Sequence, residues 1–127
     1  MAFSALNWLI CNTVYHWIKI FDNEQALENN VPLNGKQLVV ARGKKILLAR
    51  TLNGYCAVQD RCPHNGASLS GGFCTTEGEV VCPLHRYRFS LKTGKATSGG
   101  SFTLEVYPLE IKADGVFIGI KAGWWEF

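Results

Sequence analysis

Two short loops of this 127-residue chain carry the same pair of metal-binding side chains. The first loop has the motif Cys62-Pro-His64, the second has Cys82-Pro-Leu-His85, and 17 residues (65–81) separate them. Thiolate and imidazole groups are typical transition-metal ligands. We therefore expect a fold that brings these two loops together around one metal site.

The rest of the chain has the pattern of short antiparallel strands. Turn signals such as Asn53-Gly54 and Asp114-Gly115 recur about every eight to twelve residues between apolar or alternating runs. This order predicts an all-β antiparallel sandwich or barrel. One helical turn is expected at 24–29, and strands are expected at 17–20, 36–41, 45–50, 55–59, 79–81, 87–91, 102–107, 109–112 and 116–121.

The strand pattern changes in the middle of the chain. Between Asp60 and Gly100 the expected strands are shorter, and Gly, Pro, Ser and Thr are frequent. We interpret residues 60–100, approximately, as a small subdomain built around the metal, within one domain covering 15–127. Residues 1–14 are then an N-terminal extension. Its apolar run lacks the basic start of a signal peptide and is too interrupted for a membrane span.

Charge and cysteine content exclude some functions. The formal charge is +3, without a Lys/Arg block, so nucleic-acid binding is not expected. The five cysteines are an odd number in a chain large enough to fold without disulfides. They indicate a reducing compartment, the cytoplasm, and metal-bound or buried thiols.

The ligand set Cys62, His64, Cys82 and His85 suits two different metal sites. Zinc takes two thiolates and two imidazoles in one tetrahedron. A [2Fe-2S] centre can divide the same set, with two cysteines on one iron and two histidines on the other. The spacing favours the cluster, because zinc sites more often use Cys-x2-Cys or His-x3–5-His pairs.

These motifs, together with Phe89 and Thr93-Gly94, resemble the Rieske family over about residues 17–121. The chain is similar to its low-potential soluble members, which include ferredoxin components of ring-hydroxylating dioxygenases and the small subunit of NAD(P)H-dependent nitrite reductase. The resemblance implies one Rieske [2Fe-2S] cluster per chain. It also implies a Rieske-type β framework with a small cluster-binding β subdomain, and cysteines that are buried while the histidines face solvent.

The residues around the motifs place the chain within this family. The high-potential members of the family resemble this chain but have a disulfide between the two loops, where this chain has Ala67 and Leu84. Those members also have hydroxyl side chains that donate to the cluster sulfurs, where this chain has Tyr87 and Phe89. Fewer hydrogen bonds to sulfur predict a potential at the low end of roughly −150 to +300 mV. Arg86 departs from the glycine usual after the second histidine in similar ferredoxins.

The predicted function is one-electron transfer without independent catalysis. The only histidine besides the two ligands is His16, so a second iron site with two histidines and a carboxylate is not expected. The expected partners are redox proteins, namely a reductase and an oxygenase. One alternative is a small subunit bound to the large subunit of a nitrite reductase, and a less favoured one is a structural zinc-binding module. The pattern leaves the oligomeric state open.

Overall fold

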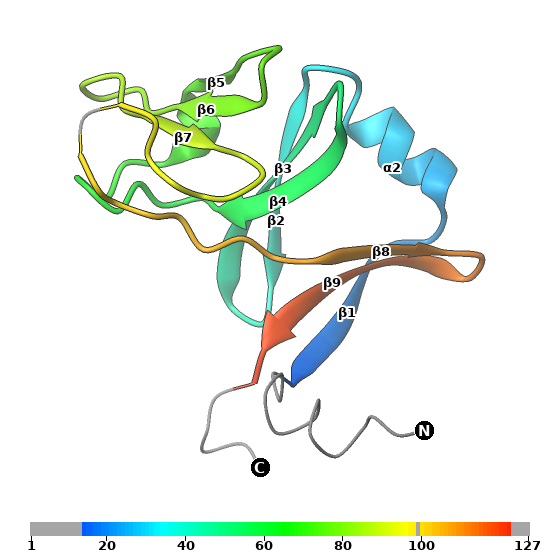
Figure 1. The fold of residues 1–127 in the computed structure, drawn as a ribbon. Coiled ribbons are helices and arrows are strands. Elements are labelled where there is room, and N and C mark those ends of the chain that lie inside the picture. Colours follow the sequence, from blue (N-terminus) through cyan, green and yellow to red (C-terminus); the bar gives the residue numbers. More distant parts are fainter. Residues whose placement is uncertain (1–13, 99, 123–127) are drawn as a thin grey trace, which may run out of the picture.

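The computed structural model describes residues 14–98 and 100–122, and within them the chain forms three antiparallel sheets of three strands each (Figure 1). The predicted all-β fold is confirmed, whereas most of the expected 1–14 extension lies outside the described residues. The first sheet has the order β1 (Tyr15–Phe21), β9 (Gly115–Lys121), β8 (Leu109–Lys112). The second has the order β2 (Lys36–Ala41), β3 (Lys44–Thr51), β4 (Gly54–Gln59). The third, smaller sheet has the order β5 (Phe73–Cys74), β6 (Glu79–Val81), β7 (Arg88–Ser90).

The two ends of the described chain meet in the first sheet. β1 pairs with β9 in a register that runs from Tyr15 opposite Lys121 to Phe21 opposite Val116. Helix α2 (Glu24–Asn30) follows β1 and begins where the Asn23 side chain accepts a hydrogen bond from the Ala26 N–H at 2.8 Å. No helix among the described residues is long and apolar enough to cross a membrane.

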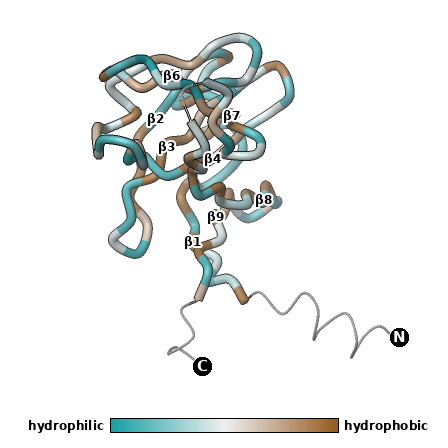
Figure 2. Tube along the Cα trace, turned by 60° about the vertical axis from the view of Figure 1, so that its left-hand side comes forward, coloured by the Kyte–Doolittle hydropathy of each residue, from teal (hydrophilic) through white to brown (hydrophobic). Residues whose placement is uncertain are grey.

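Strand β3 lies between two hydrophobic cores. Successive side chains of a strand point to opposite faces, so Ile46 and Leu48 enter one core while Leu47 and Ala49 enter the other. Burial on both faces explains the nearly continuous apolar run of this strand. Figure 2 shows this hydrophobic stretch along β3 in the middle of the molecule.

Each core joins the middle sheet to one neighbour. The first core contains buried residues of the middle and first sheets and of α2, including Leu27, Ala57, Val116, Ile118 and Ile120. The second core joins the opposite face of the middle sheet to the small sheet, and it includes Leu69, Val80, Phe89, Leu91, Leu104 and the two motif cysteines. Figure 1 shows the first and third sheets on opposite sides of the middle sheet.

The prediction of a strand at 102–107 is wrong. This segment makes only isolated bridges, Lys95 with Thr103 and Val58 with Val106. Its backbone N–H groups donate to different segments: Leu104 to the Gly94 carbonyl at 2.7 Å, and Tyr107 to the Ala57 carbonyl at 2.8 Å. The segment therefore crosses from the small sheet to the middle sheet and does not pair along one strand. The short 3-10 helix Leu69–Gly71 and strand β5 were not predicted.

Gly72, the residue before β5, lies against the backbone of β6. A Cβ at this position would overlap the carbonyl oxygen of Val81, the residue before Cys82. At the neighbouring Gly71 the nearest atom to a Cβ would be Pro83 Cγ at 3.7 Å, an ordinary contact. The segment that enters the small sheet thus requires glycine at position 72 and tolerates a methyl group at position 71.

We predict that Gly72→Ala lowers the free energy of unfolding by about 1–3 kcal/mol, because overpacking forces β5 away from β6. The matched variant Gly71→Ala is expected to change it by less than about 0.5 kcal/mol. Urea unfolding followed by circular dichroism measures both. Equal stability of the two variants would contradict the close approach at Gly72.

Candidate metal centre

The first metal-binding loop follows β4 and closes on itself. The Cys62 N–H donates to the Ala67 carbonyl at 2.8 Å, and the Gly66 N–H donates to the Cys62 carbonyl at 2.8 Å. The Asn65 side-chain oxygen accepts from the Ala67 N–H at 2.9 Å. Gly66 has φ +80°, a conformation that glycine adopts without steric cost. These bonds hold His64 at the turn of a tight loop.

The second loop, between β6 and β7, repeats the same closure. The Cys82 N–H donates to the Tyr87 carbonyl at 2.8 Å, again five residues further along the chain. His85 and Arg86 have φ values of 64° and 56°. Arg86 stands four residues after its cysteine, as Gly66 does in the first loop, so an arginine occupies a left-handed position. That conformation costs a non-glycine residue about 1–2 kcal/mol.

A buried carboxylate ties the first loop to the framework. Asp60 is only 4% exposed, and it accepts hydrogen bonds from the Ser68 hydroxyl and from the Ser70 N–H, the latter at 2.8 Å. The Lys36 ammonium of β2 donates to the Ser70 carbonyl at 2.7 Å. The chain leaving the loop is therefore bound to both β4 and β2. Sequence reasoning missed Asp60, because a single aspartate at a strand end carries no distinctive signal.

The two motif cysteines are buried in the second core. Cys62 is 1% exposed and Cys82 is 0% exposed. Burial raises the pKa of the Cys62 thiol, and the neighbouring Cys82 thiol raises it further, while hydrogen bonds from the backbone N–H groups of Asn65 and His64 oppose the shift. A buried thiol pair with N–H donors aimed at sulfur fits a metal that replaces the thiol protons.

The two motif histidines lie on the opposite, solvent side of the loops. Both are exposed, and their ring centroids lie 6.1 Å apart with nearly perpendicular planes. The Tyr87 ring lies 4.2 Å from His64 and 6.4 Å from His85. The structure thus arranges the predicted ligands as a buried sulfur pair and an exposed imidazole pair. Among the described residues, no three His, Cys, Asp or Glu side chains gather as they do around a single ion.

Phe102 is a site residue that sequence reasoning missed, because its segment was predicted to be a strand. Its ring packs edge-on against His64 with centroids 5.3 Å apart, and it is 39% exposed. Since Phe102 comes from neither metal-binding loop, only the tertiary fold brings it to the site. Together with Tyr87 it limits the orientations open to the His64 ring.

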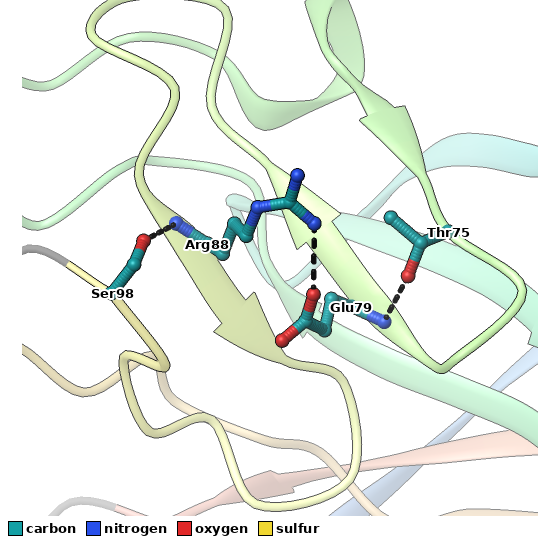
Figure 3. A network of polar contacts seen from close by, with 4 residues as sticks. All are labelled: Thr75, Glu79, Arg88 and Ser98. Atoms are coloured by element: carbon teal, nitrogen blue, oxygen red, sulfur yellow. Dashed lines mark hydrogen bonds and ion pairs between the residues drawn. The ribbon is translucent and has the colours of Figure 1, made fainter.

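A polar network holds the segment before Phe102 against the small sheet (Figure 3). The Arg88 guanidinium pairs with Glu79 at 3.1 Å, and the Arg88 N–H donates to the Ser98 hydroxyl at 3.2 Å. A hydrogen bond with the Thr97 side chain holds the pKa of Glu79 below its usual value. The hydrogen bond and positive charge of Arg88 lower it further. The network therefore links β6 and β7 to residues 97–98 and so supports the position of Phe102.

Asn65 connects the two loops. Its side-chain oxygen is used by the Ala67 N–H, so its amide nitrogen faces the second loop, 3.7 Å from Cys82 Sγ and 3.5 Å from the Leu84 carbonyl. N–H groups near cluster sulfurs stabilise the added charge of the reduced state. Asn65 is therefore the polar side chain best placed to adjust the potential of this site.

Comparison with known proteins identifies the family. The model of the Rieske [2Fe-2S] domain matches residues 16–108. The 3-phenylpropionate/cinnamic acid dioxygenase ferredoxin subunit of Escherichia coli (strain K12) is 34% identical over 87 residues, which cover 68% of this chain and 82% of that protein. The chain belongs to the Rieske [2Fe-2S] domain family.

Solved structures agree with this assignment. A chain in the complex of reduced oxygenase and oxidized ferredoxin in carbazole 1,9a-dioxygenase has a TM-score of 0.68 and 25% identity, covering 80% of this chain and 91% of that one. The putative NADH-dependent nitrite reductase small subunit from Mycobacterium tuberculosis has a TM-score of 0.72 and 20% identity, covering 87% and 99%. At 20% identity the second likeness shows a shared fold alone.

The family also decides between the two metals. Its cofactor is the Rieske [2Fe-2S] cluster, so the zinc alternative is set aside. The donor set agrees with this cofactor, because two thiols are buried together in the second core and two imidazoles are exposed together at the surface.

We predict that Asn65→Asp lowers the midpoint potential of the cluster. The substitution keeps the oxygen that accepts from Ala67 but replaces the N–H donor near Cys82 with a negative charge. Loss of a hydrogen bond worth about 0.5–1.5 kcal/mol corresponds to roughly 20–65 mV for one electron. Redox titration by visible absorption measures the shift. The control Asn53→Asp makes the same charge change in a turn of the middle sheet, and an equal shift there would contradict a local effect.

We predict that Arg86→Gly raises the free energy of unfolding relative to Arg86→Ala by about 1 kcal/mol, because only glycine removes the left-handed strain. Both variants lose the same side chain and charge, so their difference isolates the backbone effect. Denaturant unfolding of the cluster-loaded protein measures it. A glycine variant no more stable than the alanine variant would show that the loop carries no strain at Arg86.

Proposed function

We propose that this protein is a one-electron carrier, the ferredoxin component of a multicomponent oxygenase, with its cluster held by Cys62, Cys82, His64 and His85. The observation that supports it best is the pairing of two buried thiols and two exposed imidazoles on two loops that share the same closing hydrogen bond, from the cysteine N–H to the carbonyl five residues on. When bound, the cluster supplies a reversible one-electron redox change.

The proposed ligands make the two sides of the site different. Cys62 and Cys82 would bind from inside the second core, where water is excluded. His64 and His85 would bind from the surface, so a docked partner approaches the imidazole side. Tyr87 and Phe102 hold the His64 ring by packing. A preorganised site of this kind suits repeated oxidation and reduction without rearrangement of its ligands.

An oxygenase system is favoured over a nitrite reductase as the physiological setting. The relative that is 34% identical is a dioxygenase ferredoxin subunit, whereas the likeness to a nitrite reductase small subunit is one of fold. A reductase would then be the electron donor and an oxygenase the acceptor, with no catalysis by this chain alone. We further propose a cytoplasmic location, a domain covering 15–127 and a cluster-binding subdomain of about residues 60–100.

The proposal is tested on protein purified without oxygen. We expect equal amounts of iron and inorganic sulfide, an EPR signal of the reduced cluster, and transfer of one electron per chain to cytochrome c as an artificial acceptor. Cys62→Ser is expected to lose the cluster, while Cys74→Ser, which changes a thiol outside the proposed ligand set, retains it. Loss of the cluster in both variants, or in neither, would contradict the proposed ligands. Failure to pass electrons to any acceptor would contradict the carrier role.

A further inference from the structure

A groove of about 590 Å³ lies beside the first metal-binding loop. Its walls come from the turn between β2 and β3, the end of β4, the first loop itself and the segment before β8. Three of its lining side chains are cations, Lys44, Lys45 and Arg61, and all three are exposed. The site described above uses none of these three.

The cations of the groove outnumber its carboxylates. Lys44, Lys45 and Arg61 take part in no salt bridge with any residue that the structure describes. The two carboxylates that also line the groove already have hydrogen-bond donors. Asp60 is buried and bonded to Ser68 and Ser70, and Glu105 accepts from the Tyr107 hydroxyl at 3.0 Å. The lining therefore has a formal charge of +1, with three exposed cations against one exposed carboxylate, Glu105, and one buried carboxylate, Asp60.

Arg61 links the groove to the metal-binding loop. Its Nε and a terminal guanidinium nitrogen lie 3.4 Å from the place where a Cβ of Gly66 would be. The guanidinium thus lies along the backbone of the loop that carries Cys62 and His64. A segment bound in the groove would contact that loop directly.

We propose that this groove binds an acidic segment of the redox partner, which rests on the carrier function proposed above. Lys44 and Lys45 act as point charges, and Arg61 offers a planar fork that fits a carboxylate. An excess of cations in a concave surface concentrates the field and speeds the encounter with an acidic partner. A partner bound in this groove would contact Arg61 and Gly66, which belong to the loop that carries His64.

The test uses the full cluster-loaded protein and a fluorescein-labelled hexaglutamate peptide at low ionic strength, with binding followed by fluorescence anisotropy. We expect Lys44→Glu/Lys45→Glu to weaken binding by about tenfold or more, and Lys44→Gln/Lys45→Gln to weaken it to an intermediate extent. The control Lys19→Glu/Lys112→Glu makes the same net charge change at lysines already paired with Asp22 and Glu110. It is expected to change binding by less than about threefold.

Two results would overturn the acidic-segment proposal. Equal weakening in the groove variant and its control would show that net charge alone attracts the peptide. Binding of inorganic pyrophosphate in the groove without binding of hexaglutamate would indicate a small oxyanion site. Iron content, EPR signal and electron transfer to cytochrome c are measured on every variant, so failure of the groove proposal is distinguishable from failure of the carrier function.

Discussion

The structure depends on the burial of one strand from both sides. Because β3 sends Ile46 and Leu48 into one core and Leu47 and Ala49 into another, the small sheet gains an apolar surface to pack on. The second core so formed contains Cys62 and Cys82. A thiolate buried there without a positive partner is costly, so cluster binding and the packing of the small sheet stabilise each other.

The polarity of the site follows from this arrangement. Sulfur ligands lie in the core and imidazoles lie at the surface, because each loop closes over its cysteine and projects its histidine outward. Residues outside the two loops then refine the site. Asp60 anchors the first loop, Asn65 reaches Cys82, and Phe102 packs on His64. Arg61 and Gly66 of the first loop line the same groove as Lys44 and Lys45, so a partner bound there would contact the loop that carries His64.

Much of the fold follows from local patterns. Apolar alternation and turn residues predicted most of the strands of the first and middle sheets. Short turns such as Asn53-Gly54 join β2 to β3, β3 to β4 and β8 to β9, whereas β1 and β9 pair from opposite ends of the described chain. The prediction was wrong at 102–107, where the same alternation occurs. There Leu104 is buried by the small sheet, while the backbone bonds are shared among Gly94, Gln59 and Ala57. Alternation of apolar and polar residues indicates which side chains face a core. It does not indicate whether a neighbouring strand is present to pair with.

The sequence by itself determined the family, the metal-binding motifs and the antiparallel class of fold, because these depend on residue type and short spacing. The tertiary structure alone decided that Arg86 takes a left-handed conformation, that Phe102 reaches His64, and that Lys44, Lys45 and Arg61 share one groove. The Arg86 conformation belongs to the closure of its own loop between Cys82 and Tyr87, and the other two arrangements join segments far apart in the chain. Such contacts are formed by packing around two shared cores, which no local pattern of residues encodes.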